Sequence, residues 1–147
     1  MPARVLIVED EPDVLLVLRI NLEAAGFETS LAADGVTALR RIQTDRPDAV
    51  LLDLMLPVVD GWAVLAELKS RADATPVVVC SAKRTPRDLA RAEELGAVGY
   101  VAKPFETEDV VERITEAVRA TRPHLLGEFE TEPPLPGALG IEGIEPA

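Results

Sequence analysis

The sequence predicts an α/β fold in which a parallel sheet of five strands is covered by helices on both faces. Short apolar runs rich in β-branched residues recur five times and alternate with stretches of helical periodicity. The runs do not alternate polar with apolar residues, which is typical of strands buried on both faces. Five strand–helix repeats indicate a parallel sheet, and right-handed crossovers leave few topologies for it.

The five strands and five helices follow one another in strict alternation. We expect strands at residues 5–8, 29–32, 49–52, 77–80 and 98–102, of which 29–32 is the weakest. We expect helices at about residues 13–25, 35–44, 60–71, 87–95 and 107–120. Leu15, Leu18 and Leu22 have the spacing of one apolar helix face. Gly26 and Gly96 follow two of the helical stretches, where glycine is typical of a helix end.

Composition excludes several classes of function. The chain has 15 Lys and Arg against 26 Asp and Glu, a net charge of −11, which disfavours binding to nucleic acid or anionic membranes. Its single cysteine excludes an internal disulfide framework and a cysteine-based zinc site. The apolar runs are too short to span a bilayer, and the amino terminus does not resemble a signal peptide. We therefore expect a cytoplasmic protein with no membrane insertion.

The composition changes near residue 121. Residues 122–147 contain five of the twelve prolines, four of the nine glycines, and five acidic residues against one basic residue. A segment of this composition buries little apolar surface. We expect residues 1–121 to form one domain and residues 122–147 to form an acidic, Pro/Gly-rich, disordered tail.

Polar residues follow four of the predicted strands directly. Glu9 and Asp10 follow the first strand and Asp53 the third, while Ser81 follows the fourth and Lys103 the fifth. The carboxyl ends of parallel strands lie along one edge of the sheet, where open α/β sheets bind ligands. The fold therefore gathers three carboxylates, one hydroxyl and one ammonium group.

This set of groups suits phosphoryl transfer. Clustered carboxylates repel one another unless a cation lies among them, and Mg²⁺ binds carboxylates, waters and phosphate oxygens. Asp53 would be the nucleophile that forms an aspartyl phosphate. Lys103 would neutralise charge on the transferred group, and Ser81 would donate a hydrogen bond to one of its oxygens. The sequence thus predicts a phosphoryl-acceptor site.

Several segments resemble the response-regulator receiver domains of bacterial two-component signalling, in the family's order and spacing. They are Val5-Leu-Ile-Val-Glu-Asp-Glu-Pro12, Asp53-Leu-Met-Leu-Pro57-Val-Val-Asp60-Gly61, Cys80-Ser81-Ala82, Glu94-Leu-Gly96-Ala-Val-Gly99-Tyr100 and Lys103-Pro104-Phe105. The match covers about residues 4–120. The resemblance implies a flavodoxin-like, doubly wound sheet with strand order 2-1-3-4-5.

The resemblance also implies a reaction and a cofactor. Asp53 would receive a phosphoryl group from a sensor histidine kinase or a histidine phosphotransfer protein. Mg²⁺ would be held by Glu9, Asp10, Asp53 and the backbone carbonyl of Met55, with Glu9 acting through water. The bond before Pro104 is expected to be cis by the same analogy.

Ser81 and Tyr100 occupy the switch positions of the family. The phosphoryl group would draw the Ser81 hydroxyl inward, and the Tyr100 ring would follow. The surface formed by residues 87–95, 98–102 and 107–120 would then change its affinity for a downstream protein.

The leading interpretation is a stand-alone receiver that is not an enzyme and catalyses only its own Mg²⁺-dependent phosphorylation and dephosphorylation. The alternative is a Mg²⁺-dependent phosphatase or phosphotransferase with an aspartyl-phosphate intermediate. Such enzymes need an acid two residues after the nucleophile, where this chain has Met55. The side chains of Met55 and Lys83 suggest slow self-dephosphorylation, because both would crowd the attacking water.

Three further residues have structural interpretations. Asp60 and Gly61 are expected to form a turn and a helix start. Cys80, inside an apolar run, is expected to be a small buried side chain. The sole tryptophan, Trp62, is either a partly buried ring or a partner contact.

Overall fold

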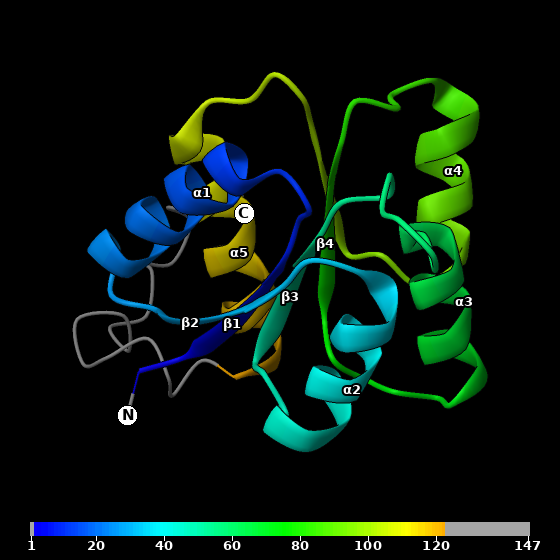
Figure 1. Cartoon of the computed structure of the whole chain (residues 1–147), viewed down its shortest axis with the longest axis horizontal. Helices are drawn as coiled ribbons and strands as arrows, with labels where there is room; N and C mark the ends of the chain where they lie inside the picture. Colours follow the sequence, from blue (N-terminus) through cyan, green and yellow to red (C-terminus); the bar gives the residue numbers. More distant parts are fainter. Residues whose placement is uncertain (1, 123–147) are drawn as a thin grey trace, which may run out of the picture.

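A computed structural model describes residues 2–122 of the chain (Figure 1). Apart from Arg122, the tail expected at residues 122–147 lies outside the described residues. The ten described elements alternate between strand and helix, as predicted. In chain order they are β1 (Arg4–Val8), α1 (Pro12–Ala24), β2 (Glu28–Ala32), α2 (Gly35–Asp45), β3 (Ala49–Leu52), α3 (Gly61–Ser70), β4 (Val77–Ser81), α4 (Pro86–Glu94), β5 (Gly99–Ala102) and α5 (Thr107–Thr121).

The five strands form one parallel sheet in the order β2-β1-β3-β4-β5, which confirms the predicted topology. The register aligns the carboxyl ends of the central strands, because Val8 lies opposite Leu52 and Leu52 lies opposite Val79. The residues that directly follow β1 and β3 are therefore neighbours. The reversal of strand order between β1 and β3 opens the edge of the sheet at this point.

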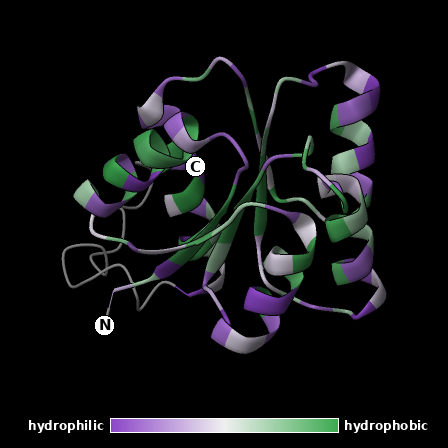
Figure 2. Cartoon of the chain, in the orientation of Figure 1, coloured by the Kyte–Doolittle hydropathy of each residue, from purple (hydrophilic) through white to green (hydrophobic). Residues whose placement is uncertain are grey.

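Helices cover both faces of the sheet (Figure 1). Helices α1 and α5 lie on one face, and α2, α3 and α4 lie on the other. Ile7 packs with Leu22 and Ile114 in the first layer, and Leu6 packs with Ile42 and Leu65 in the second. Because both faces are buried, the strands are apolar throughout, and Figure 2 shows them largely green between helices of mixed colour.

Side-chain caps and glycines fix the ends of the helices. The side chains of Asp34, Asp60 and Thr85 accept hydrogen bonds from the backbone at the starts of α2, α3 and α4, so the helix start expected at Asp60 is confirmed. Gly26 and Gly96 follow the ends of α1 and α4 with φ of 99° and 101°. Both predicted helix ends are confirmed. None of the helices within residues 2–122 is long and apolar enough to cross a membrane.

Val58, in the loop between β3 and α3, has a left-handed backbone conformation with a φ of 65° and a side chain that is 92% exposed. This conformation costs a side chain with a Cβ roughly 1–2 kcal/mol, and Val58 regains little by burial. We expect Val58→Gly to raise the free energy of unfolding by about 0.5–1 kcal/mol, because strain relief exceeds the added entropy of the unfolded chain.

Urea denaturation of the two proteins measures this difference. Val58→Ala serves as the control, because alanine keeps the Cβ at positive φ and should gain less than glycine. A Val58→Gly protein no more stable than the wild type would show that the loop stores no such strain.

Candidate functional site

Three carboxylates meet at the carboxyl edge of the sheet. Glu9 directly follows β1 and Asp53 directly follows β3, and the Asp53 N–H donates to the carbonyl of Val8 (3.0 Å). One carboxylate oxygen from each of Glu9, Asp10 and Asp53 lies within 4.8 Å of the others. Glu9 and Asp53 are buried, whereas Asp10 is exposed. The cluster is therefore open to solvent on the side of Asp10.

Lys103 reaches this cluster from β5, which lies two strands away from β3. Its backbone N–H donates to the carbonyl of Ser81 (2.9 Å), so the residue continues the β4–β5 pairing. Its Nζ donates to Glu9 Oε1 (2.8 Å) and to Asp53 Oδ2 (3.1 Å). The peptide bond between Lys103 and Pro104 is cis. One ammonium group thus links two buried carboxylates from different strands.

The pKa values of Glu9 and Lys103 depend on burial and on the contacts of these groups with each other and with Asp53. Burial raises the pKa of Glu9 above its usual value, while the hydrogen bond from Lys103 opposes the rise. Burial alone would lower the pKa of Lys103, but the hydrogen bonds to Glu9 and Asp53 outweigh it and raise that pKa above its usual range. Lys103 therefore stays protonated at neutral pH.

The same groups fit a divalent cation. Three carboxylates and one ammonium carry a formal charge of −2, which a divalent ion would neutralise. All the side-chain donors are carboxylate oxygens, the ligands that Mg²⁺ prefers, and exposed Asp10 leaves room for water on the ion. The donor set therefore matches Mg²⁺ rather than a metal that prefers nitrogen or sulfur ligands.

Met55 positions Asp53 through its backbone. Its N–H donates to Asp53 Oδ1 (3.1 Å), while its side chain is 56% exposed. The two oxygens of Asp53 thus receive hydrogen bonds from different donors, Oδ1 from Met55 and Oδ2 from Lys103. This pair of bonds fixes the plane of the carboxylate.

The two predicted switch residues meet at Lys83 rather than at Asp53. Ser81 is fully buried at the end of β4, and its Oγ accepts a hydrogen bond from the Lys83 N–H (3.3 Å). Tyr100 is half-buried on β5, and its hydroxyl donates to the Lys83 carbonyl. Burial raises the pKa of the Tyr100 phenol, so it stays a hydrogen-bond donor at neutral pH.

Sequence reasoning missed the contribution of Gly61 to the site. A Cβ at Gly61 would lie 2.4 Å from the carbonyl oxygen of Asp53, and the Gly61 N–H donates to the Leu54 carbonyl (2.9 Å). Only glycine allows the start of α3 to approach the site this closely. Glycine is unfavourable within a helix. Its presence at the start of α3 was therefore a sequence signal of this close approach.

Trp62 is partly buried and contacts another helix. The guanidinium carbon of Arg91 on α4 lies 4.2 Å from the centroid of the Trp62 ring on α3. This is the geometry of a cation–π interaction. The sequence left open a partly buried ring or a partner contact for Trp62, and the structure shows a partly buried ring.

Cys80 is buried, as predicted, and its thiol should be unreactive in the folded protein. Burial raises the pKa of Cys80 to about 12, so almost no thiolate exists at neutral pH. We expect iodoacetamide at pH 7.5 to leave the native protein unmodified and to alkylate it once in denaturant. Intact mass measures both states, and alkylation of the native protein at the denatured rate would contradict the burial.

Comparisons with known proteins identify the family. A family model described as the response regulator receiver domain matches residues 5–115, and the chain belongs to this family. The transcriptional activator protein IrlR of Burkholderia pseudomallei (strain 1026b) is 44% identical over 116 residues, which are 79% of this chain and 50% of IrlR. The chain thus spans about half the length of the curated relatives it matches.

Solved receiver domains have the same fold. The Francisella response regulator 1452 receiver domain is 28% identical, with a TM-score of 0.79 over 82% of this chain and 99% of that one. The receiver domain of sensor histidine kinase PA1611 from Pseudomonas aeruginosa PAO1 is also 28% identical, with a TM-score of 0.73 over 80% of this chain and 98% of that one. That structure is described as having a magnesium ion coordinated in its active site cleft.

Proposed function

We propose that this receiver accepts a phosphoryl group on Asp53 from the phosphohistidine of a histidine kinase or a histidine phosphotransfer protein. The observation that supports this most directly is the placement of Asp53. Its carboxylate is buried beside two further carboxylates, yet it is held in one orientation by the Lys103 ammonium and the Met55 N–H. A buried, oriented carboxylate paired with a cation is a suitable nucleophile toward a phosphoryl group.

In the transfer, a bond forms between an Asp53 oxygen and phosphorus while the bond from phosphorus to the histidine nitrogen breaks. Lys103 offers a fixed positive charge to the oxygens of the transferred group, at no cost in reorganisation because it is already oriented. We propose that Glu9, Asp10, Asp53 and the Met55 carbonyl hold Mg²⁺. When bound, this ion supplies further neutralisation of the phosphoryl oxygens.

The switch follows from the contacts of Ser81. A phosphoryl group on Asp53 presents acceptor oxygens near the end of β4, and the Ser81 hydroxyl donates to one of them. Lys83 and Tyr100 respond, because Lys83 bonds both hydroxyls through its backbone. The surface of α4, β5 and α5 then changes its affinity for a downstream protein. A difference in phosphoryl binding between two conformations is what such a switch requires.

Position 55 disfavours the enzyme alternative. A phosphatase with an aspartyl-phosphate intermediate needs a proton donor near the leaving group. The side chain of Met55 supplies no proton. Accordingly, the only reactions that we propose for this chain are its own phosphorylation and dephosphorylation. Slow dephosphorylation stays a prediction, based on the exposed side chains of Met55 and Lys83.

The output and location of the receiver are separate proposals. The chain matches about half the length of relatives named as transcriptional activators or response regulators. The stand-alone arrangement stays a prediction, and the mass of the native polypeptide on an immunoblot tests it. A cytoplasmic location in a bacterium is likewise a prediction from the family.

Phosphorylation by a small donor should depend on Mg²⁺. We expect the full chain with acetyl phosphate and Mg²⁺ to gain one phosphoryl group by intact mass, and EDTA to reduce this gain at least tenfold. Without the ion the carboxylates repel the incoming anion, and only Lys103 offsets that repulsion. Adding excess Mg²⁺ back should restore the reaction. Equal phosphorylation in EDTA would exclude a metal requirement.

A further inference from the structure

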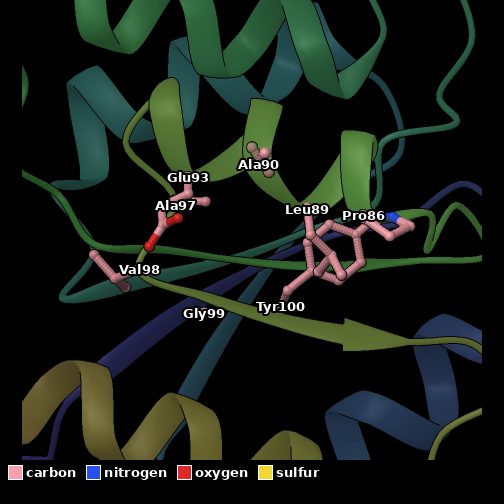
Figure 3. Close-up of a pocket in the computed structure, with 9 residues that line it drawn as sticks. Pro86, Leu89, Ala90, Glu93, Ala97, Val98, Gly99 and Tyr100 are labelled. Atoms are coloured by element: carbon pink, nitrogen blue, oxygen red, sulfur yellow. The ribbon is translucent and has the colours of Figure 1, made fainter.

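Helix α4 and strand β5 enclose a groove of about 500 Å³ (Figure 3). Its lining is mainly apolar, with Ala97 and Val98 toward one end and Leu89 and Tyr100 toward the other. Leu89 is 41% exposed and Val98 is 59% exposed. Strand β5 is the last strand of the sheet, so its outer edge has no neighbouring strand within residues 2–122. An apolar surface of this kind is typical of a binding groove.

Positive charge gathers beside this groove although the chain as a whole is acidic. Four of the 15 lysines and arginines lie within nine residues, and all four are exposed: Lys83, Arg84, Arg87 and Arg91. Arg91 contacts the Trp62 ring. The side chains of the other three form no ion pair or hydrogen bond among residues 2–122.

Helix α4 carries three acidic residues, but only Asp88 lies in its first turn, close in sequence to Lys83, Arg84 and Arg87. Asp88 accepts a hydrogen bond from the hydroxyl of Thr85 (2.8 Å), and Glu93 lines the groove one helical turn after Leu89. The start of α4 therefore carries an excess of cations. A ligand that covers both the groove and the start of α4 would combine apolar side chains with carboxylates.

The chain itself contains a segment of this chemistry. Residues 125–132 read Leu-Leu-Gly-Glu-Phe-Glu-Thr-Glu, with three large apolar side chains and three carboxylates. Across residues 123–147 there are five acidic residues and no lysine or arginine. The apolar side chains of the segment thus match the groove, and its carboxylates match the cations at the start of α4.

The segment is also close enough to reach the groove. Helix α5 ends at Thr121, and the Arg122 guanidinium contacts Asp48 (3.1 Å) just before β3. The near end of the groove, at Val98, lies at the same edge of the sheet two strands away, about 10 Å across. The seven residues from Arg122 to Phe129 span up to about 23 Å.

From these observations we infer that residues 125–132 bind in the α4–β5 groove of their own chain. The side chains of Leu125, Leu126 and Phe129 contact the apolar lining, and the glutamates lie toward Lys83, Arg84 and Arg87. The intramolecular link favours this contact over a separate peptide of equal affinity. If the proposed function also holds, the segment covers the groove lined by Tyr100 and competes there with a downstream protein.

Nuclear magnetic resonance of the full unphosphorylated chain tests this inference without relying on phosphorylation. We expect Leu126→Ser with Phe129→Ser to shift the amide signals of Leu89, Val98 and Tyr100. Ile141→Ser with Ile144→Ser, the same kind of change outside the segment, is the control. The shifts at the groove should be at least threefold larger in the first protein, because only that one loses the apolar contacts.

A charge reversal on α4 tests the same inference independently. Arg87→Glu should shift the amide signals of residues 125–132, whereas Arg40→Glu, an exposed cation on α2, should leave them in place. Unchanged groove signals in the Leu126 and Phe129 variant would overturn the inference. Shifts that disappear on tenfold dilution would also overturn it, because the segment would then bind a second copy of the chain.

Discussion

Replacing Asp53 with asparagine is expected to abolish phosphoryl uptake from acetyl phosphate in the presence of Mg²⁺. The amide has nearly the same shape, and its oxygen still accepts the hydrogen bond from the Met55 N–H. It lacks the anionic oxygen that attacks phosphorus, and the other three charged groups of the site cannot replace that nucleophile. Intact mass after incubation measures the loss, and peptide mapping of the wild type places the modification on Asp53.

Asp60→Asn is the matched control for this variant. Asp60 lies in the same loop and caps α3, and asparagine caps helices as well as aspartate does. This protein should be phosphorylated at the wild-type rate. Phosphoryl uptake by the Asp53→Asn protein would instead place the acceptor on another residue and remove the basis of the proposed function.

Replacing Lys103 with methionine should separate two properties of the site. Phosphorylation should slow at least tenfold, because no fixed cation remains to offset charge on the phosphoryl oxygens. Mg²⁺ should bind more tightly, because the formal charge of the cluster changes from −2 to −3. Without Mg²⁺, the free energy of unfolding should fall by about 3–5 kcal/mol, since Glu9 and Asp53 lose the ammonium that they share.

Isothermal titration with Mg²⁺ and phosphorylation rates measure the two effects on one protein. Lys69→Met is the control, because Lys69 donates to the Glu94 carbonyl at the far end of α4 and should alter neither property. A purely structural effect of Lys103 would weaken Mg²⁺ binding and phosphorylation together. That result would contradict the electrostatic role assigned to this residue.

The sequence was sufficient for the fold and for the main cluster of the site. Each end of a predicted strand or helix lies within one residue of the observed end. Local signals explain this agreement, because apolar runs mark buried strands, and Asp60 and Gly96 mark helix ends. Glu9, Asp53 and Lys103 come together because a parallel sheet places every strand's carboxyl end along one edge.

Other features depend on tertiary distances that periodicity does not encode. The lack of room for a Cβ at Gly61 arises only because α3 begins against the backbone of Asp53. The pairing of Arg91 with Trp62 requires that α3 and α4 be neighbours on one face. The shared contacts of Lys83 with Ser81 and Tyr100 depend on the path of a loop, which local sequence specifies least.

The contacts of Lys83 with Ser81 and Tyr100 do not depend on the identity of the side chain at position 83. Both bonds use main-chain atoms, an N–H toward Ser81 and a carbonyl toward Tyr100. Any residue other than proline supplies that N–H, so the lysine side chain is dispensable for the connection between the two hydroxyls. Mutation at this position can therefore change the charge that a partner meets while both hydrogen bonds are kept.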